Sequence, residues 1–387
     1  MEDKIKNFEF EIRTHVMYGE GKAAGLGDLL KAESFTNAAV IVDAAMTDNQ
    51  YVKSALSGIT SAKVSVFENP VAEPTYDFLD EFRKKFSGKH FDCVIGIGGG
   101  STLDLAKGMA TLLVNEGPAI TYRGFPKLAV RPLPVIALPT TAGTGSEVTY
   151  NAVFTDSKEK RKMGINSKYN YPLHAVLDPL LTLSCPEKVT VSSGMDAMVH
   201  TLESFVSRNA TIYSRMFSRQ AFALLYGNLL KVLDEPGNVE TRGRILLGSH
   251  FAGAALMNSG AGPAGAMSYP LGAVYKVPHG IAGAVFINKI VRFNVKHGYT
   301  EYEQLYDLLD GADASLSPQE KSAEFSKKID ELCAKLKVPQ KLTTFGLTAK
   351  DIDFLNEQIF TGLKGAIDQN PVPMQREDMR IILEKMF

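Results

Sequence analysis

Asp196 and His200 stand out first, because they lie four residues apart in a segment with helical apolar spacing. Side chains at this spacing project from the same face of a helix, one turn apart. A carboxylate and an imidazole placed in this way can hold one divalent cation, which accepts mixed oxygen and nitrogen ligands. The same pair is more often a surface or capping contact. The pair alone therefore does not establish a metal site.

A third candidate ligand is His279, which lies between Pro278 and Gly280. These neighbours constrain the backbone, so that the imidazole points in one direction. The alternative is a turn histidine exposed to water. The remaining histidines have no comparable setting, and we expect structural roles for them: His15, His90, His174, His250 and His297.

A glycine-rich segment follows the apolar run at 92–97 and precedes a helical pattern at 103–107. It consists of Gly98, Gly99, Gly100, Ser101 and Thr102. A strand, a glycine turn and a helix bring free N–H groups and the positive end of a helix dipole to a pyrophosphate. Ser101 or Thr102 can also cap the helix. Because the spacing is not GxGxxG, a plain tight turn remains an equal alternative.

A second loop, at 139–147, follows the apolar run at 135–138 and contains Thr140, Thr141 and Thr144. Hydroxyl groups at the end of a strand suit contacts to phosphate and ribose, although such a loop can also satisfy its own backbone. Two loops of this kind after two strands favour a nucleotide site. Asp43 ends the apolar run at 39–42, where a carboxylate can accept from ribose hydroxyls and repel a 2′-phosphate. This favours NAD over NADP, unless Asp43 merely opens a turn.

Elements that could position these residues differ between the two halves of the chain. Runs at 38–42, 63–67, 92–97 and 134–138 predict buried strands, and 76–86 has helical spacing. Alternating strands and helices predict a parallel sheet covered on both faces, with the cofactor at the carboxyl ends of its strands. From about residue 192 onward the periodicity is helical. We expect close helix packing, rather than a linker, for the Ala- and Gly-rich stretch at 251–272.

Composition excludes several classes of function. The 387 residues, 45% of them hydrophobic, suffice for two core-bearing domains. Lys plus Arg (42) balances Asp plus Glu (43), so we expect a small-molecule partner and neither nucleic acid nor a membrane surface. Three widely spaced cysteines argue against disulfides and a cysteine zinc site. Without a signal-like or membrane-spanning apolar stretch, we expect a cytoplasmic protein.

In combination, these motifs resemble the iron-containing (group III) alcohol dehydrogenases over nearly the whole chain. The likeness rests on Gly98-Gly99-Gly100-Ser101 with Asp104 and Lys107, the 139–147 loop, Gly194-Met195-Asp196 with His200, Pro270-Leu271-Gly272, and Pro278-His279-Gly280. It implies a dehydroquinate synthase-like fold, with an α/β NAD-binding domain at 1–185 and an all-helical metal-binding domain at 186–387. It also implies an active site between the two domains, and we expect a homodimer.

The resemblance also implies roles for individual residues. It makes Asp196, His200 and His279 the metal ligands. It places NAD against Asp43, Asn69, Gly98, Gly99, Gly100, Ser101, Thr102, Thr140, Thr141, Thr144, Asn151 and Lys162.

The chain departs from the family pattern at two positions. The family has histidines fourteen and ten residues before the histidine of Pro-His-Gly, where this chain has Gly265 and Tyr269. Glycine cannot coordinate, so we expect three protein ligands, an open position and weaker metal binding. Zinc then becomes an alternative to ferrous iron, and a metal-free site remains open. Tyr269 is a candidate catalytic proton-transfer group, or it fills the space.

The expected activity is that of a metal-dependent, NAD-linked alcohol dehydrogenase or aldehyde reductase. The altered ligand set resembles the branch that acts on functionalised primary alcohols, such as the C8 hydroxyl of 3-deoxy-D-manno-octulosonate in lipopolysaccharide biosynthesis. A phosphonate-linked aldehyde is an alternative substrate. A dehydroquinate-synthase-like lyase would need a dense basic cluster, which the sequence lacks. A non-catalytic NAD-binding protein with a decayed metal site is the remaining alternative, against which retention of three ligands argues.

Overall fold

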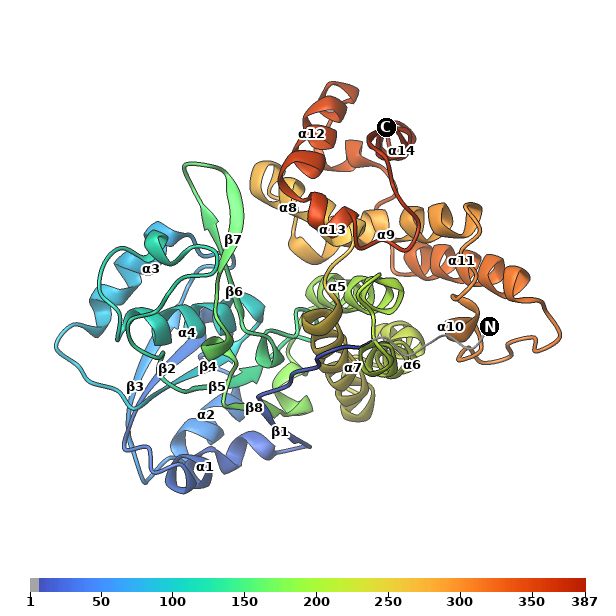
Figure 1. The fold of residues 1–387 in the computed structure, drawn as a ribbon. Coiled ribbons are helices and arrows are strands. Elements are labelled where there is room, and N and C mark those ends of the chain that lie inside the picture. The colour runs from blue at the N-terminus through green and yellow to red at the C-terminus, as the bar shows by residue number, and fades with distance from the viewer. Residues whose placement is uncertain (1–6) are drawn as a thin grey trace. The chain divides into compact units, whose positions relative to one another are not determined.

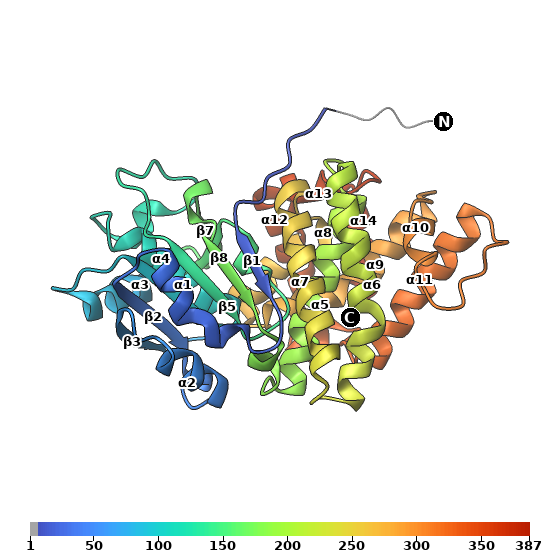
Figure 2. The ribbon, with the colours of Figure 1, turned by 90° about the horizontal axis from the view of Figure 1, so that it is seen from below.

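The computed structural model describes residues 7–387, whose elements fall into two units. The α/β unit comprises Ile12–Glu187 and Glu235–His250. The helical unit comprises residues 7–11, Lys188–Asp234 and Phe251–Phe387. Figures 1 and 2 show the elements of both units.

A six-stranded parallel sheet forms the centre of the α/β unit, in the order β1-β8-β5-β4-β2-β3. Its strands are β1 (His15–Tyr18), β2 (Asn37–Asp43), β3 (Lys63–Asn69), β4 (Cys93–Gly98), β5 (Val135–Pro139) and β8 (His174–Leu177). A separate antiparallel hairpin joins β6 (Asn151–Asp156) and β7 (Arg161–Asn166). The four predicted strands are confirmed. We did not predict β1, β8 or the hairpin.

Helices cover both faces of this sheet (Figure 1). Val40 and Ile95 pack towards α1 (Leu26–Ala32) and α2 (Gln50–Ser57). The neighbouring residues Ile41 and Val94 pack towards α3 (Tyr76–Arg83) and α4 (Gly100–Leu112). Successive side chains of a strand point to opposite faces, so these apolar runs bury both sides of the sheet. The prediction of a doubly covered parallel sheet is confirmed.

The prediction that residues 63–67 form a buried strand was correct for the strand and wrong for its burial. β3 lies at the edge of the sheet and pairs only with β2. In this strand Lys63, Val66 and Glu68 are exposed, Val66 to 53%, and only Phe67 and Asn69 are buried. An apolar run predicts a strand but not the position of that strand in the sheet. The position determines how much of the strand is covered by neighbouring elements.

The strand order changes direction between β2 and β4. These strands are neighbours, but the chain continues from β2 to β3 on one side and from β4 to β5 on the other. Crevices at such switch points, outside the carboxyl ends of the strands, are where open α/β sheets bind ligands. Asp43 ends β2 and Gly98 ends β4. The fold therefore places two predicted NAD-site residues at this point.

Among the described residues, the helical unit contains helices and no strand, which confirms the predicted all-helical second part. Its helices are α5 (Glu187–Val206), α6 (Ile212–Asp234), α8 (Pro263–Tyr275), α9 (His279–Lys296), α10 (Glu303–Tyr306), α11 (Pro318–Lys335), α12 (Ile352–Gly362), α13 (Lys364–Ile367) and α14 (Arg376–Glu384). Helix α7 (Val239–Ser259) belongs to this unit from Phe251 onward.

The Ala- and Gly-rich stretch at 251–272 forms the second part of α7 and most of α8. Ala252, Ala255 and Ala264 are fully buried within it. The prediction of close helix packing is therefore confirmed. In residues 7–387, every helix is too short or too polar to cross a lipid bilayer.

Candidate metal centre and nucleotide site

Helix α5 presents Asp196 and His200 on one face, as their spacing predicts. His279, the first residue of α9, joins them. Asp196 Oδ1 lies 3.7 Å from His200 Nε2 and 3.8 Å from His279 Nε2. One ligand atom from each residue lies within 4.8 Å of the others. The structure thus brings the three predicted metal ligands together.

Gly280 allows α9 to approach α5 this closely. A Cβ at this position would lie 2.0 Å from the carbonyl oxygen of Ser192 and 3.0 Å from Cβ of Asp196. Pro278 precedes His279 as the N-cap of α9, where its fixed φ suits the start of a helix. The Pro-His-Gly motif therefore positions His279 through close helix packing as well as through backbone conformation.

The donor set fits a divalent cation. Separations of 3.7 and 3.8 Å are too long for hydrogen bonds. They are close to the roughly 3.4 Å that separates two tetrahedral ligands with metal bonds of about 2.1 Å. One carboxylate and two imidazoles suit Fe²⁺ or Zn²⁺.

Glu203 was missed by sequence reasoning, although its spacing of three from His200 places it on the same face of α5. Its buried carboxylate accepts from the N–H groups of Gly262 (2.8 Å), Ala264 (2.5 Å) and Gly265 (3.1 Å), where α8 begins. Burial raises the pKa of Glu203 to about 7, although the three N–H groups lower it. A Cβ on Gly265 would lie 2.9 Å from Oε2 of Glu203. Glu203 therefore lies on the side that a side chain at 265 would enter.

Tyr269 lies beside the cluster. Its ring is edge-on to the ring of His279, with centroids 5.7 Å apart and planes inclined by 83°. The contact places Tyr269 against a predicted metal ligand. Its role in proton transfer stays a prediction.

The predicted capping of α4 by Ser101 or Thr102 was wrong. Helix α4 begins at Gly100 and has Gly99 as its N-cap, with no side-chain cap, so both hydroxyls lie inside the helix. Oγ1 of Thr102 instead accepts from Nδ2 of Asn69 (2.9 Å) and donates to Oδ2 of Asp43 (3.5 Å). Asn69, at the end of β3, thereby joins Asp43 at the switch point.

The glycines of the first loop permit close contact with threonines. A Cβ on Gly98 would lie 2.6 Å from Cβ of Thr102, and one on Gly100 would lie 2.5 Å from Oγ1 of Thr144. The N–H of Thr140 donates to the carbonyl of Gly98 (3.0 Å). The two loops therefore pack against each other. These loops and the first turn of α4 contain Gly98, Gly99, Gly100, Ser101, Thr102, Thr140, Thr141 and Thr144.

A buried charged group supports these loops. Nζ of Lys107 is fully buried and donates to the carbonyls of Thr149 (3.1 Å) and Asn151 (2.6 Å). Burial lowers the pKa of Lys107, and the nearby Asp104 opposes this change. Asp104 also accepts from the hydroxyl of Ser146 (2.6 Å). The family motif residues Asp104 and Lys107 thus fix the chain that follows the second loop.

Two residues assigned to NAD by resemblance already have contacts within the protein. The carbonyl of Asn151 accepts from Lys107, and Nζ of Lys162 lies 2.9 Å from Oε1 of Glu73. A role for either in NAD binding stays a prediction. His250, expected to be structural, is buried with its Nδ1 3.1 Å from Oε1 of Glu147 in the second loop.

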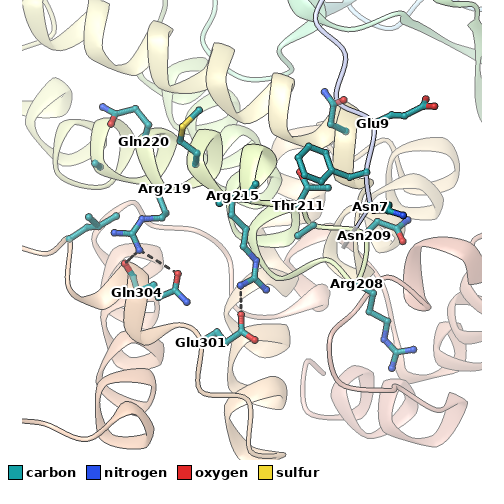
Figure 3. Close-up of a pocket in the computed structure, with 17 residues that line it drawn as sticks. Asn7, Glu9, Arg208, Asn209, Thr211, Arg215, Arg219, Gln220, Glu301 and Gln304 are labelled. Carbon is teal, nitrogen blue, oxygen red and sulfur yellow. Dashed lines mark hydrogen bonds and ion pairs between the residues drawn. The ribbon is translucent and has the colours of Figure 1, made fainter. Parts of the chain in front are cut away.

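A separate open cavity of about 1030 Å³ runs along α6 in the helical unit (Figure 3). Arg215 points to Glu301 there, and Arg219 donates to the backbone carbonyl of Gln304 at 3.2 Å. The residues that line this cavity include none of the predicted metal ligands or NAD contacts. It is therefore distinct from the candidate site.

Comparison with known proteins identifies the family. Residues 13–179 match the model for iron-containing alcohol dehydrogenase, and residues 190–387 match that for the C-terminal part of the Fe-containing alcohol dehydrogenase family. The chain belongs to the iron-containing alcohol dehydrogenase family. It is accordingly an oxidoreductase that acts on CH–OH groups.

Relatives in this family match most of the chain. The 1,3-propanediol dehydrogenase of Citrobacter freundii is 31% identical over 82% of this chain and 81% of its own length. The 4-hydroxybutyrate dehydrogenase of Clostridium kluyveri is 31% identical over 89% of this chain and 92% of its own. The structure of sulfoacetaldehyde reductase from Bifidobacterium kashiwanohense in complex with NAD⁺ has a TM-score of 0.89 at 26% identity, covering 98% of this chain and 99% of that one.

Proposed function

We propose that this iron-containing alcohol dehydrogenase uses NAD and a divalent metal to interconvert a short, functionalised primary alcohol and its aldehyde. The observation that carries the proposal is the convergence of Asp196 and His200 on α5 with His279 on α9. A metal site that had lost its function would not be expected to keep three ligand atoms within 4.8 Å of one another. We further propose a cytoplasmic homodimer.

The metal ligands are one carboxylate oxygen of Asp196 and the Nε2 atoms of His200 and His279, with Fe²⁺ or Zn²⁺ as the cation. When bound, the cation supplies Lewis-acid stabilisation of charge on the substrate oxygen, and NAD supplies the hydride acceptor. Helices α5 and α9 hold one ligand atom from each of the three residues within 4.8 Å of the others. Tyr269, beside His279, is the candidate group for proton transfer.

NAD contacts are proposed within residues 1–185 and metal contacts within 186–387. Support for the NAD contacts comes from the switch point of the sheet, where Asp43, Asn69 and Thr102 meet. Two Gly- and Thr-rich loops follow β4 and β5 there. The free N–H groups at the start of α4 suit the pyrophosphate.

The substrate class is proposed from the relatives. A diol, a hydroxy acid and a sulfoaldehyde, taken from their names, each carry a second polar group on a short chain. None of these names is that of an enzyme acting on an eight-carbon sugar acid. The C8 hydroxyl of 3-deoxy-D-manno-octulosonate and a phosphonate-linked aldehyde therefore enter only as members of a test panel.

Formation or consumption of NADH with such a panel tests the proposal. We expect turnover of at least one short alcohol or aldehyde that carries a hydroxyl, carboxylate, sulfonate or phosphonate group. A chain that binds NAD but turns over no member of the panel would support the alternative of a non-catalytic NAD-binding protein.

The Asp43→Asn variant tests cofactor choice. The amide side chain keeps an oxygen that can accept from the N–H of Ala45, as the carboxylate of Asp43 does (3.0 Å), but it carries no negative charge. We expect the unmodified protein to bind NAD more tightly than NADP, because the negative charge of Asp43 repels the 2′-phosphate of NADP. The difference between the two affinities should be smaller in the variant. Titration with both cofactors measures it. Equal affinities of the unmodified protein for NAD and NADP would contradict the proposal that Asp43 selects NAD.

The Gly265→His variant tests the missing ligand. An added imidazole is expected to increase the metal retained after dialysis against chelator, if position 265 faces the cation. The matched control is Gly265→Ala, because either Cβ must displace Oε2 of Glu203 from 2.9 Å. Metal retention that is no higher in Gly265→His than in Gly265→Ala would show that our alignment of this segment is wrong.

A further inference from the structure

Ser268 of α8 contacts His279 of α9 through its hydroxyl. Oγ of Ser268 lies 2.6 Å from the carbonyl oxygen of Gly265 and 3.2 Å from Nδ1 of His279. The side chain is buried, since the residue is 1% exposed. A hydroxyl has a single proton for these two contacts, so the direction of one hydrogen bond fixes the direction of the other.

The directions follow from the acceptors. A carbonyl oxygen can only accept, and 2.6 Å is a typical O–H···O distance, so Ser268 donates to Gly265. Its oxygen then accepts from Nδ1–H of His279. A neutral imidazole protonated at Nδ1 carries its lone pair on Nε2. In His279 this is the atom that lies 3.8 Å from Asp196 Oδ1 in the metal cluster.

We propose that Ser268 is a positioning residue for the metal centre, because it fixes the tautomer and ring orientation in which His279 binds a cation. The inference rests on the proposed metal site. Groups that bind the far nitrogen of a ligating histidine orient the ring and raise its basicity. A site with three protein ligands depends strongly on each of them.

The contact belongs to a longer chain of hydrogen bonds. Oε2 of Glu203 accepts from the N–H of Gly265, the carbonyl of Gly265 accepts from Ser268, and Ser268 accepts from His279. These bonds hold the backbone of Gly265 between Glu203 and Ser268. Gly265 therefore contributes through its backbone at a position where the family has a ligating side chain. His200 differs, because its Nδ1 has no hydrogen-bond partner among residues 7–387.

Metal affinity of the full-length, metal-depleted protein tests the proposal. Zn²⁺ and Co²⁺ affinities are measured by competition with a chromophoric chelator. Ser268→Ala is expected to weaken binding about 10- to 100-fold and to alter the visible spectrum of bound Co²⁺. NAD affinity should be unchanged. Ser268→Thr, which keeps a hydroxyl, should restore most of the affinity.

Two controls separate positioning from a general structural effect. Ser259→Ala removes a buried helical hydroxyl that donates to the carbonyl of Ala255 at 2.8 Å and touches no histidine, so metal affinity should not change. In a His279→Ala background, Ser268→Ala should cost no further affinity, because its effect passes through that ring. This double-mutant cycle tests the positioning role of Ser268 even if Ser268→Thr fails to fold.

Each outcome bears on the proposal. Parent-like metal affinity in Ser268→Ala overturns it while leaving the proposed function intact. An equal loss with and without His279 also overturns it, since the serine would then act elsewhere. An unmodified protein that binds neither metal overturns both this inference and the proposed metal-dependent function.

Discussion

Turnover by the His200→Ala and His279→Ala variants is expected to fall by roughly a thousandfold or more, while NAD affinity stays within a few-fold of that of the unmodified protein. Each change removes one of three ligands, and metal polarisation of a substrate oxygen contributes several kcal/mol to transition-state stabilisation. The predicted NAD contacts lie on β2, β3, β6, β7, the first turn of α4 and the loops after β4 and β5, and the three ligands lie on α5 and α9. Steady-state NADH formation and NAD titration measure the two effects separately.

His297→Ala provides the matched control, because His297 is an exposed histidine that follows the last residue of α9, the helix that His279 begins. Its loss should leave both turnover and metal content unchanged. If His200→Ala or His279→Ala retained full activity, those residues would not hold a catalytic metal.

Gly280→Ala is expected to have the second largest effect, with loss of metal binding and a lower melting temperature. The new Cβ would lie 2.0 Å from the carbonyl oxygen of Ser192, so α9 must move away from α5 and take His279 with it. Overpacking of this kind typically costs about 1–3 kcal/mol, and a backbone atom yields less readily than a side chain. Thermal unfolding and metal analysis of the purified variant provide the measurements.

Gly283→Ala is the control within the same helix. A Cβ there would lie 3.6 Å from the methyl groups of Val199, an ordinary contact, and alanine favours helix over glycine by about 1 kcal/mol. This variant should keep its metal and melt no lower than the parent. Normal metal binding by Gly280→Ala would contradict the role that we assign to Gly280.

Much of the fold could be predicted because its signals are local. Apolar runs identified β2, β3, β4 and β5, and helical spacing identified α3 and much of the helical unit. The edge position of β3 could not be predicted, because strand order depends on pairing between distant segments. The strands β1 and β8, with four residues each, and the hairpin, whose strands mix polar and apolar residues, were missed because none of them contains a sustained apolar run.

The metal ligands could be predicted from their residue types and from resemblance, whereas the groups that support them could not. The contacts of Glu203 and Ser268 form only because α8 lies against α5 and α9, which no local pattern reveals. The spacing of three residues between His200 and Glu203 could have been used to predict that Glu203 lies on the same face of α5. The capping prediction at Ser101 and Thr102 failed because Gly99 already provides the N-cap of α4.

Metal content and turnover, measured in one preparation before and after chelation, test the central claim most directly. We expect a single divalent ion per chain, loss of the ion together with NADH formation on dialysis against chelator, and recovery of both after addition of Fe²⁺ or Zn²⁺. Full NADH-forming activity in chains that hold no metal would contradict the account, because Asp196, His200 and His279 would then converge for some other reason.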